Sequence, residues 1–265
     1  MNNLNNKIIS EKLINKGFFK ILTYNALEST NKTAKELGSN GEKEGTVVVA
    51  AHQTNGRGRM GRSFYSPQGS GVYFSVLLRP RIDAENTVLI TTGAAVAVCK
   101  AIEALSKNKA KIKWVNDVFV SDKKVSGILT EAVTSSSGEK FDYVVLGIGV
   151  NLAAPKSGYP DDIKNIAGCI FKEETENFRE NFVASFLNFF YPVYKSLEEK
   201  SFLNEYKERL LVLNRQITYQ KGGRQVTAKV KDIDGLCRLV TETYNGEIDV
   251  ISSGEITLGS RNFTK

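Results

Sequence analysis

Cysteine is scarce in this sequence, and its spacing argues against two kinds of site. The 265 residues contain three cysteines, Cys99, Cys169 and Cys237, which lie far apart and form no Cys-x-x-Cys pair. A disulfide framework needs an even set of closely spaced cysteines, and a zinc site needs paired Cys or His ligands. The sequence therefore favours a reducing compartment, and we expect the protein to be cytoplasmic.

Histidine is rarer still, and His52 is the single example. Catalytic triads built on Ser–His or Cys–His pairs, and metal sites rich in histidine, are therefore not expected. Because His52 follows an apolar run, we interpret it as a neutral side chain at the end of a strand.

Long hydrophobic runs are missing as well. We find no stretch of about 18 consecutive apolar residues, the length typical of a membrane-spanning helix. The N-terminal sequence MNNLNNKIISEKLINKGFFK has neither the apolar segment nor the small-residue cleavage site of a secretory signal. We expect no membrane partner.

Acidic residues are outnumbered by basic ones. The 36 Lys and Arg residues against 29 Asp and Glu residues give a net charge of +7 and a pI of about 9.1. This balance favours anionic partners such as nucleotides, nucleic acid or an acidic protein, and it also fits an ordinary soluble surface. The choice depends on where the positive charge is concentrated.

The order of apolar patterns predicts an α/β body followed by a small β-barrel. The chain divides into an N-terminal arm or short helix over 1–19, the body over 20–212 and the barrel over 213–265. Patterning predicts helices at 28–38, 85–105, 176–199 and 202–210, strands at 46–53, 71–80 and 141–152, and a strand–hairpin–strand unit at 111–133. Aromatic residues at helical spacing in 176–199 predict a stripe that faces the core. After Leu213, the turn signals Lys221-Gly222-Gly223 and Asn245-Gly246 separate short β-like runs.

Positive charge is concentrated in a glycine-rich segment with the sequence QTNGRGRMGRSF, which begins at Gln53. Three glycines and three arginines occupy the seven residues from Gly56 to Arg62. Glycine lets backbone N–H groups wrap an anion, and arginine adds fork-shaped donors for phosphate or carboxylate. The segment matches neither dinucleotide-binding nor P-loop signatures, and it lies between two predicted strands, unlike an RG-rich nucleic-acid tail. It predicts an anion-binding loop that its ligand orders.

Two further segments carry polar groups near strand ends. In KWVND and KVSGIL, Lys113 and Lys124 are expected on adjacent strands of one hairpin, with Asp117 within reach of the same ligand. A solvated Lys–Asp surface is the alternative interpretation. In GIGVN, the glycines let a flat ring or chain lie against the backbone, and Asn151 offers the donor and acceptor that an adenine edge requires.

Together these motifs resemble those of the biotin protein ligases. ESTN, GRGRMGRSF, KWVNDV, KVSGIL and GIGVN occur in this order between Tyr24 and Leu152, about half of the chain, and GEITL follows at 254–258. The resemblance implies an α+β catalytic domain over 20–212, similar to class II synthetases and to biotin–lipoate ligases, with a mixed sheet flanked by helices. It also implies that 213–265 form a small SH3-like β-barrel.

The resemblance implies a two-step reaction. The carboxylate of biotin attacks the α-phosphate of ATP, giving biotinyl-5′-AMP and pyrophosphate. A lysine of a biotin carboxyl carrier protein domain then takes the biotin and releases AMP, which is the activity of a biotin–[acetyl-CoA-carboxylase] ligase. Magnesium is expected with ATP, through ligands that the spacing leaves unidentified. No covalent enzyme intermediate is needed, in agreement with the missing Ser–His and Cys–His pairs.

The same resemblance implies roles for individual residues. The residues expected at biotin are Ser29, Thr30, Asn31, Gln53, Gly56, Arg57, Gly127, Ile128 and Gly149. The residues expected at ATP or the adenylate are Arg57, Gly58, Arg59, Arg62, Phe64, Lys113, Asn116, Lys124 and Asn151. Lys124 and Arg59 are expected to stabilise charge at the α-phosphate, and Asp117 to orient the incoming lysine amine.

The sequence departs from the family pattern in three respects. Val115 replaces the usual proline of KWPND, which removes rigidity but no functional group. Phe64 stands where tryptophan is common, so adenine stacking there depends on a smaller ring. Some members carry an N-terminal DNA-binding helix-turn-helix and act as repressors. The residues before the catalytic domain are too few for one, and we expect no operator binding.

Alternatives remain open at this point. A lipoate ligase shares the implied fold and adenylate chemistry, although the GRGRxGR and KWxND segments have the biotin-type form. A basic nucleic-acid-binding module would fit the net charge, but no recognisable motif supports it, and we expect no nucleic-acid partner. The C-terminal region could close the ATP site, contact the acceptor domain or only support the sheet. Monomer and homodimer are both compatible with the sequence.

Overall fold

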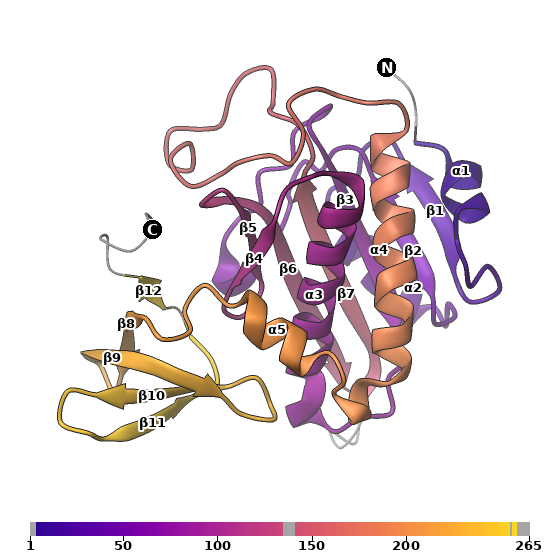
Figure 1. Ribbon diagram of the computed structural model, residues 1–265. Coiled ribbons are helices and arrows are strands. Elements are labelled where there is room, and N and C mark those ends of the chain that lie inside the picture. The colour runs from indigo at the N-terminus through magenta and orange to yellow at the C-terminus, as the bar shows by residue number, and fades with distance from the viewer. Residues whose placement is uncertain (1–3, 135–140, 255, 259–265) are drawn as a thin grey trace.

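A large mixed β-sheet forms the centre of the molecule (Figure 1). The computed structural model describes residues 4–134, 141–254 and 256–258, and within them seven strands build this sheet in the order β1-β2-β3-β7-β6-β5-β4. The strands are β1 (Lys20–Tyr24), β2 (Thr46–Ala50), β3 (Gly71–Leu78), β4 (Ala110–Lys113), β5 (Asp117–Val120), β6 (Lys123–Thr134) and β7 (Phe141–Asn151). The first two pair in parallel and the other neighbours are antiparallel.

Helices cover both faces of this sheet. They are α1 (Asn6–Glu11), α2 (Thr30–Ser39), α3 (Thr87–Leu105), α4 (Phe178–Lys195) and α5 (Leu203–Arg209). Helices α3 and α4 lie side by side on one face (Figure 1). Alternate residues of β2 serve the two faces, because Val47 and Val49 join the main core while Val48 packs with Ala34 of α2.

Helix α3 is the most apolar element of the body. With the short turn before it, the helix is long and apolar enough by composition to cross a membrane, a property that the sequence analysis did not anticipate. However, 72% of its most apolar window is buried inside the protein. Burial between the sheet and α4 therefore accounts for its composition.

Helix α4 carries the predicted aromatic stripe. Phe182, Phe186 and Phe190 are buried, and the last two rings stack with centroids 5.3 Å apart. Phe186 also meets Phe74 of β3 edge to face at 5.2 Å. The prediction that these residues face the core is confirmed, since they join the helix to the sheet.

Residues 111–133 contain one strand more than predicted. Two tight turns divide this segment into β4, β5 and β6, and Ser121 and Asp122 form the second turn with φ angles of 47° and 61°. Lys113 pairs with Asp117, and Lys124 pairs with Phe119. The expectation that Lys113 and Lys124 lie on adjacent strands is therefore wrong, because β5 lies between them. The first turn, at residues 114–116, contains no glycine or proline, so the sequence did not indicate it.

The C-terminal residues form a second, smaller sheet. Among the described residues it has the order β11-β10-β9-β8-β12, and every pairing is antiparallel. Its strands are β8 (Gln216–Lys221), β9 (Arg224–Ile233), β10 (Leu239–Thr243), β11 (Ile248–Ile251) and β12 (Thr257–Leu258). Both predicted turn signals lie between strands, with positive φ at Gly222, Gly223 and Gly246. The predicted fold class, a mixed sheet flanked by helices with a small C-terminal β domain, is confirmed.

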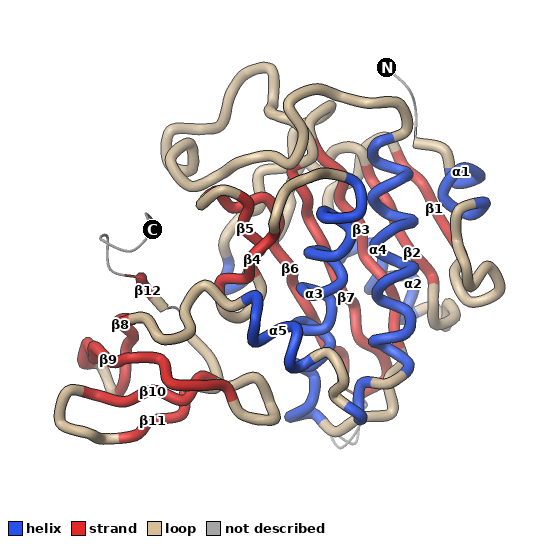
Figure 2. Tube along the Cα trace, in the orientation of Figure 1, coloured by secondary structure: helices blue, strands red, loops and turns tan. Residues whose placement is uncertain are grey.

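Two connecting regions complete the body. The predicted N-terminal arm contains α1, which packs on α4. Leu4, Ile9 and Leu13 of this arm join the core, and only Ile9 belongs to the helix. Residues 152–177, between β7 and α4, form a long loop at one end of the sheet (Figure 2). The boundaries proposed for the three parts of the chain stay predictions.

Candidate functional site

One cavity gathers most of the residues singled out by their motifs. It has a volume of about 240 Å³ and lies where the N-terminus of α2, the glycine–arginine loop and strands β5, β6 and β7 meet. The predicted residues that line it are Ser29, Thr30, Asn31, Gln53, Arg57, Gly58, Arg59, Arg62, Phe64, Lys113, Asn116, Asp117, Lys124, Gly127, Ile128 and Gly149.

Gly56 and Asn151 lie outside this lining. A Cβ atom on Gly56 would fall 2.4 Å from the carbonyl oxygen of Phe64 and 2.5 Å from Ser66 Oγ, so the glycine serves the packing of the loop. Asn151 ends β7, and its Nδ2 donates to the carbonyl oxygen of Gly168 at 3.0 Å. The ligand contacts expected of these two residues stay predictions.

The end of the cavity beside α2 is neutral and mostly buried, and we call it the neutral end. Ser29, Thr30 and Asn31 are between 2% and 5% exposed. The Thr30 amide and hydroxyl both donate to Gln53 Oε1, at 2.8 and 3.1 Å. Ser75 Oγ, fully buried behind them, lies 2.8 Å from Thr30 Oγ1 and 2.6 Å from Asn31 Oδ1. These side chains hold one another in fixed orientations.

Glu131 fixes the amide of Asn31. Asn31 Nδ2 donates to Glu131 Oε2 at 2.7 Å, and Lys35 Nζ lies 2.5 Å from the other oxygen. Burial alone would raise the pKa of Glu131, but the hydrogen bonds from Lys35 and Asn31 outweigh it and hold the pKa below its usual range. A charged carboxylate only accepts hydrogen bonds, so Nδ2 faces Glu131 and Oδ1 faces Ser75.

The neutral end offers more acceptor sites than hydrogens. The Thr30 hydroxyl hydrogen is engaged by Gln53, and Ser75 has a single hydroxyl hydrogen for two acceptors, Thr30 Oγ1 and Asn31 Oδ1. One of these oxygens therefore lacks a donor within the group. Such an arrangement suits a ligand that brings N–H groups.

The opposite end of the cavity is cationic, and we call it the charged end. The glycine–arginine loop folds back on itself, because the Gly58 amide donates to the Arg62 carbonyl at 2.7 Å and the Phe64 amide to the Gly56 carbonyl at 2.9 Å. Met60 and Gly61 turn the chain with φ angles of 54° and 75°. This turn includes the short 3₁₀ segment η1 (Arg59–Gly61).

Strands β5 and β6 add an ion pair to the charged end. Lys124 Nζ lies 2.7 Å from Asp117 Oδ1, and the two side chains are 30% and 23% exposed. Arg59 Nη1 donates to Asn116 Oδ1 at 3.2 Å, which ties the loop to the residue before Asp117. The three predicted catalytic residues, Arg59, Asp117 and Lys124, are thus brought to one side of the cavity.

Phe64 covers the glycines of β6 and β7. A Cβ atom on Gly127 would lie 3.1 Å from the Phe64 ring, and one on Gly149 would lie 2.5 Å from it. The ring also meets Tyr73 edge to face at 6.3 Å. Only glycine at position 149 leaves room for this ring. Gly127 and Gly149, which were expected to border the biotin chain, therefore contact Phe64 in this structure.

Several residues at or behind the cavity were not named as site residues in the sequence. Ser75 and Glu131 stand behind the neutral end and lie outside the quoted motifs. The lining residues that lie within the motifs but were not named are Met60, Ser63, Trp114, Leu129, Gly147, Ile148, Gly254, Ile256 and Thr257. The last three belong to the C-terminal region, which supports the first of its three possible roles, closing the site. A serine isolated among apolar residues in VYFSVLL was an available signal, since a buried hydroxyl needs partners.

The described residues contain no group of three or more His, Cys, Asp or Glu side chains placed to hold a metal ion. His52 Nδ1 lies 2.8 Å from the Ser66 carbonyl oxygen at the end of β2. Cys99 and Cys237 are buried, and burial raises the pKa of their thiols to about 12 and about 11. These two thiols stay protonated near neutral pH and are poor nucleophiles.

Comparisons with known proteins agree with this geometry. A model of the biotin/lipoate A/B protein ligase family matches residues 24–151, and a model of the biotin protein ligase C-terminal domain matches residues 212–259. The bifunctional ligase/repressor BirA of Bacillus subtilis is 43% identical over 147 residues, which are 56% of this chain and 45% of that protein. The chain therefore spans less than half the length of that relative.

Other similarities extend over more of the chain. The biotin–[acetyl-CoA-carboxylase] ligase of Mycobacterium tuberculosis is 27% identical over 247 residues, covering 86% of this chain and 85% of that protein. The structure of a biotin protein ligase from Aquifex aeolicus in complex with biotin and ATP superposes with a TM-score of 0.74 at 27% identity, covering 91% of this chain and 98% of that chain. The two family models and these similarities agree, and the chain belongs to the biotin protein ligase family.

Proposed function

We propose that this protein is a biotin protein ligase, which activates biotin with ATP and transfers it to a lysine of a biotin carboxyl carrier protein domain. One observation carries the proposal: a single cavity joins a buried, acceptor-rich neutral end to a cationic loop and the Lys124–Asp117 pair. Family membership and the similarity to a ligase solved with biotin and ATP support it. Residues 20–212 are proposed to form the catalytic unit and 213–265 its C-terminal cover.

The neutral end favours biotin over lipoate. The ureido ring of biotin has two N–H donors, which match the surplus acceptor among Ser75, Thr30 and Asn31. The dithiolane ring of lipoate has no N–H group and would leave that acceptor buried without a partner, at a cost of about 1–3 kcal/mol. A lipoate ligase is therefore the less favoured candidate.

In the first step, a carboxylate oxygen of biotin attacks the α-phosphorus of ATP, and the bond from that phosphorus to the bridging oxygen of pyrophosphate breaks. Negative charge builds on the phosphate oxygens. Lys124, Arg59 and the backbone N–H groups of the glycine–arginine loop are proposed to stabilise that charge. Lys124 would exchange part of its contact with Asp117 for the phosphate.

In the second step, the neutral amine of the acceptor lysine attacks the acyl carbon of biotinyl-5′-AMP. The bond between the carbonyl carbon and the phosphate oxygen breaks, AMP leaves, and the attacking nitrogen passes one proton to the phosphate of AMP or to water. Asp117 is proposed to orient the amine through its carboxylate. Until the acceptor arrives, the loop is proposed to cover the mixed anhydride and exclude water.

Magnesium is proposed to enter with ATP as part of the substrate. Magnesium often keeps its waters and binds through substrate phosphates with one or two carboxylates, so a dedicated protein cage is not needed. We also propose a cytoplasmic location, in keeping with three cysteines that form no disulfide in the structure. The acceptor carboxylase and the choice between monomer and homodimer are left open.

Native mass spectrometry with biotin, ATP and magnesium tests the first step directly. We expect a retained species with the added mass of biotinyl-AMP, and none when lipoate replaces biotin. An isolated carrier domain added afterwards should gain one biotin at its lysine. If only lipoyl-AMP forms, the protein is a lipoate ligase rather than a biotin ligase. If neither adenylate forms, the proposed function is refuted.

A further inference from the structure

Two buried hydrogen bonds hold the segment Trp114–Asp117, and their partner residues, Cys237 and Tyr206, do not line the cavity. The indole Nε1 of Trp114 donates to the backbone carbonyl of Cys237 at 2.7 Å. The hydroxyl of Tyr206 donates to the carbonyl of Val115 at 3.2 Å. Trp114 is 5% exposed and Tyr206 is fully buried. The two partners come from the β9–β10 loop and from α5, and neither belongs to a motif at the site.

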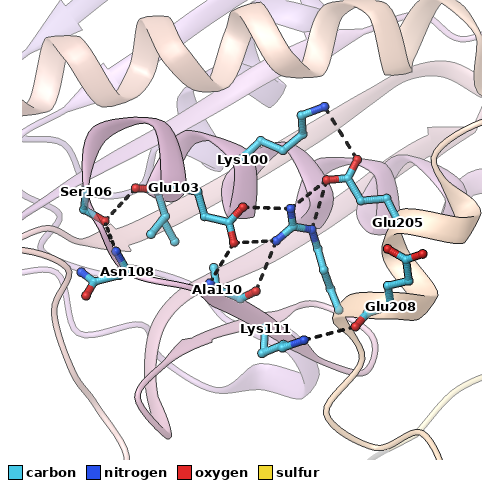
Figure 3. Close-up of polar contacts among 10 residues, drawn as sticks. Lys100, Glu103, Ser106, Asn108, Ala110, Lys111, Glu205 and Glu208 are labelled. Atoms are coloured by element: carbon cyan, nitrogen blue, oxygen red, sulfur yellow. Dashed lines mark hydrogen bonds and ion pairs between the residues drawn. The ribbon is translucent and has the colours of Figure 1, made fainter.

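Helix α5 is itself anchored to the body by Arg209 at its end. The two carboxylate partners of Arg209, Glu103 and Glu205, are labelled in Figure 3. The guanidinium donates to both carboxylate oxygens of Glu103 on α3, at 2.9 and 3.0 Å, and to Glu205 at 2.8 Å. The hydrogen bond from Arg209 holds the pKa of Glu103 below its usual range. After the helix, the Leu211 amide donates to the carbonyl of Ile112 at 2.8 Å. Tyr206 therefore stands on a helix that is fixed against α3 and β4.

The β9–β10 loop is fixed in a similar way. Asp234 accepts hydrogen bonds from the amides of Leu236 and Arg238, both at 2.9 Å, and its own carbonyl accepts from the Cys237 amide. Cys237 adopts a φ angle of 56° and is fully buried. Its Sγ lies 3.4 Å from Thr92 Oγ1 on α3. The carbonyl that accepts from Trp114 thus has a defined position.

On the other side of the segment lie the groups of the charged end. Asn116 accepts from Arg59 and donates through Nδ2 to the carbonyl of Ile128 at 2.9 Å. Asp117 follows directly and pairs with Lys124. A shift of the backbone at Trp114 or Val115 would therefore displace the pair relative to the neutral end.

We propose that Trp114 and Tyr206 are positioning residues for the charged end. Through them, α5 and the C-terminal sheet set the distance between the Asp117–Lys124 pair and the bound substrates. The effect on catalysis rests on the proposed function, whereas the effect on the segment does not. Trp114 lines the cavity, but none of the hydrogen bonds described for Thr30, Asn31 and Ser75 involves Trp114 or Tyr206. Loss of the two hydrogen bonds should therefore lower kcat and leave the binding of biotin almost unchanged.

The test compares three substitutions in the full chain. Tyr206→Phe and Trp114→Phe each remove one hydrogen bond to the segment. Tyr219→Phe is the matched control, because it removes the hydroxyl that donates to Asp249 within the C-terminal sheet, at 2.8 Å. The readouts are hydrogen–deuterium exchange over residues 114–124 and the steady-state constants of adenylate formation.

We expect faster exchange over residues 114–124 in both test variants and not in the control. Because small displacements of reacting groups are costly, kcat should fall about 5- to 30-fold while the KM for biotin changes less than about twofold. Equal exchange and equal kcat in Tyr206→Phe and Tyr219→Phe would overturn the proposal. If the wild-type protein makes no adenylate, the proposed function fails, and exchange alone supports or overturns the positioning role. Tyr206→Phe keeps the test available if Trp114→Phe fails to fold.

Discussion

The two ends of the cavity are built on opposite principles. At the neutral end, Thr30, Asn31 and Ser75 are at most 5% exposed and hold one another through short hydrogen bonds. At the charged end, Arg57 and Arg62 are exposed, and the chain turns on glycines. One end is neutral, buried and fixed by hydrogen bonds, whereas the other is cationic and more exposed.

The difference matches two tasks of unequal difficulty. A small ring with few polar atoms is told apart from similar rings only by donors and acceptors in fixed places, because a misplaced buried partner costs free energy. A polyphosphate carries enough charge to be attracted by any nearby cations, and it has to leave again as pyrophosphate. Rigid recognition at one end and adaptable charge at the other therefore suit one substrate each.

The largest effect is expected for Lys124→Ala, which removes the cation that pairs with Asp117. Loss of one group that stabilises developing charge lowers rates about 10²- to 10³-fold, so adenylate formation should fall by that factor while biotin still binds. Pyrophosphate release measures the rate. Lys123→Ala is the control. The Lys123 ammonium is exposed, and the hydrogen bond described for it goes to the carbonyl oxygen of Asn165. A loss below about tenfold would deny the charged end its catalytic role.

A smaller effect is expected for Ser75→Ala at the neutral end. The Ser75 hydroxyl is the donor shared by Thr30 Oγ1 and Asn31 Oδ1. Its loss removes this hydrogen-bond donor from both oxygens. The Kd for biotin should rise about tenfold, equivalent to about 1.4 kcal/mol, with kcat almost unchanged. Calorimetry measures the Kd. Thr91→Val removes another buried hydroxyl, paired with Thr130 at 2.7 Å, and should leave the Kd as it is. An unaltered Kd in Ser75→Ala would mean that the network does not preorganise the site.

Salt should separate the two ends without any mutation. Exposed cations are screened as ionic strength rises, whereas short hydrogen bonds between buried neutral groups are not. Between about 0.05 and about 0.5 M NaCl, the KM for ATP should rise about three- to tenfold and the Kd for biotin should change less than about twofold. Parallel titrations in sodium chloride measure both. If the KM for ATP and the Kd for biotin depend equally on salt, the neutral and charged ends do not differ in the way proposed.

The smallest effect concerns pH. The pKa of Glu131 is lowered from the usual 4.5, so its carboxylate is charged in the folded protein well into the acid range. A group with a lowered folded pKa contributes fully above its unfolded pKa, and the contribution is lost only as pH falls through the folded value. Biotin affinity should therefore stay constant within about twofold from pH 8 to about 5.5. A marked fall over this interval would show that Asn31 is not held by a permanently charged partner.

Most elements of the fold were predictable, because most have a local signal, although no strand was predicted at β1 (Lys20–Tyr24). Ser29 precedes α2 as an N-cap residue, and Gly222 and Gly246 mark hairpin turns. The prediction that Lys113 and Lys124 lie on adjacent strands was wrong because the turn at 114–116 contains no glycine or proline. One unrecognised turn changes which strands are neighbours. Strand number in a hairpin region is therefore less predictable than strand composition.

The cavity was predictable where residues occur in motifs and not where they act from a distance. Sixteen of the predicted site residues share its lining, whereas Gly56 and Asn151 do not. Tyr206 lies in an ordinary helix, which Arg209 ties to α3, and its hydroxyl reaches the carbonyl of Val115. No pattern in one sequence announces such a contact, since it depends on where two separate elements pack.

Helix α3 also bears on how the chain is made. It leaves the ribosome before β4, β5 and β6 and well before α4, the elements that later bury it. At about 5–20 residues per second, synthesis of the roughly 90 residues from the end of α3 to the end of α4 takes about 5–18 s. During that interval the nascent chain displays a segment with the composition of a membrane anchor. We therefore expect the pace of translation after Leu105 to affect how much of the product reaches its folded state.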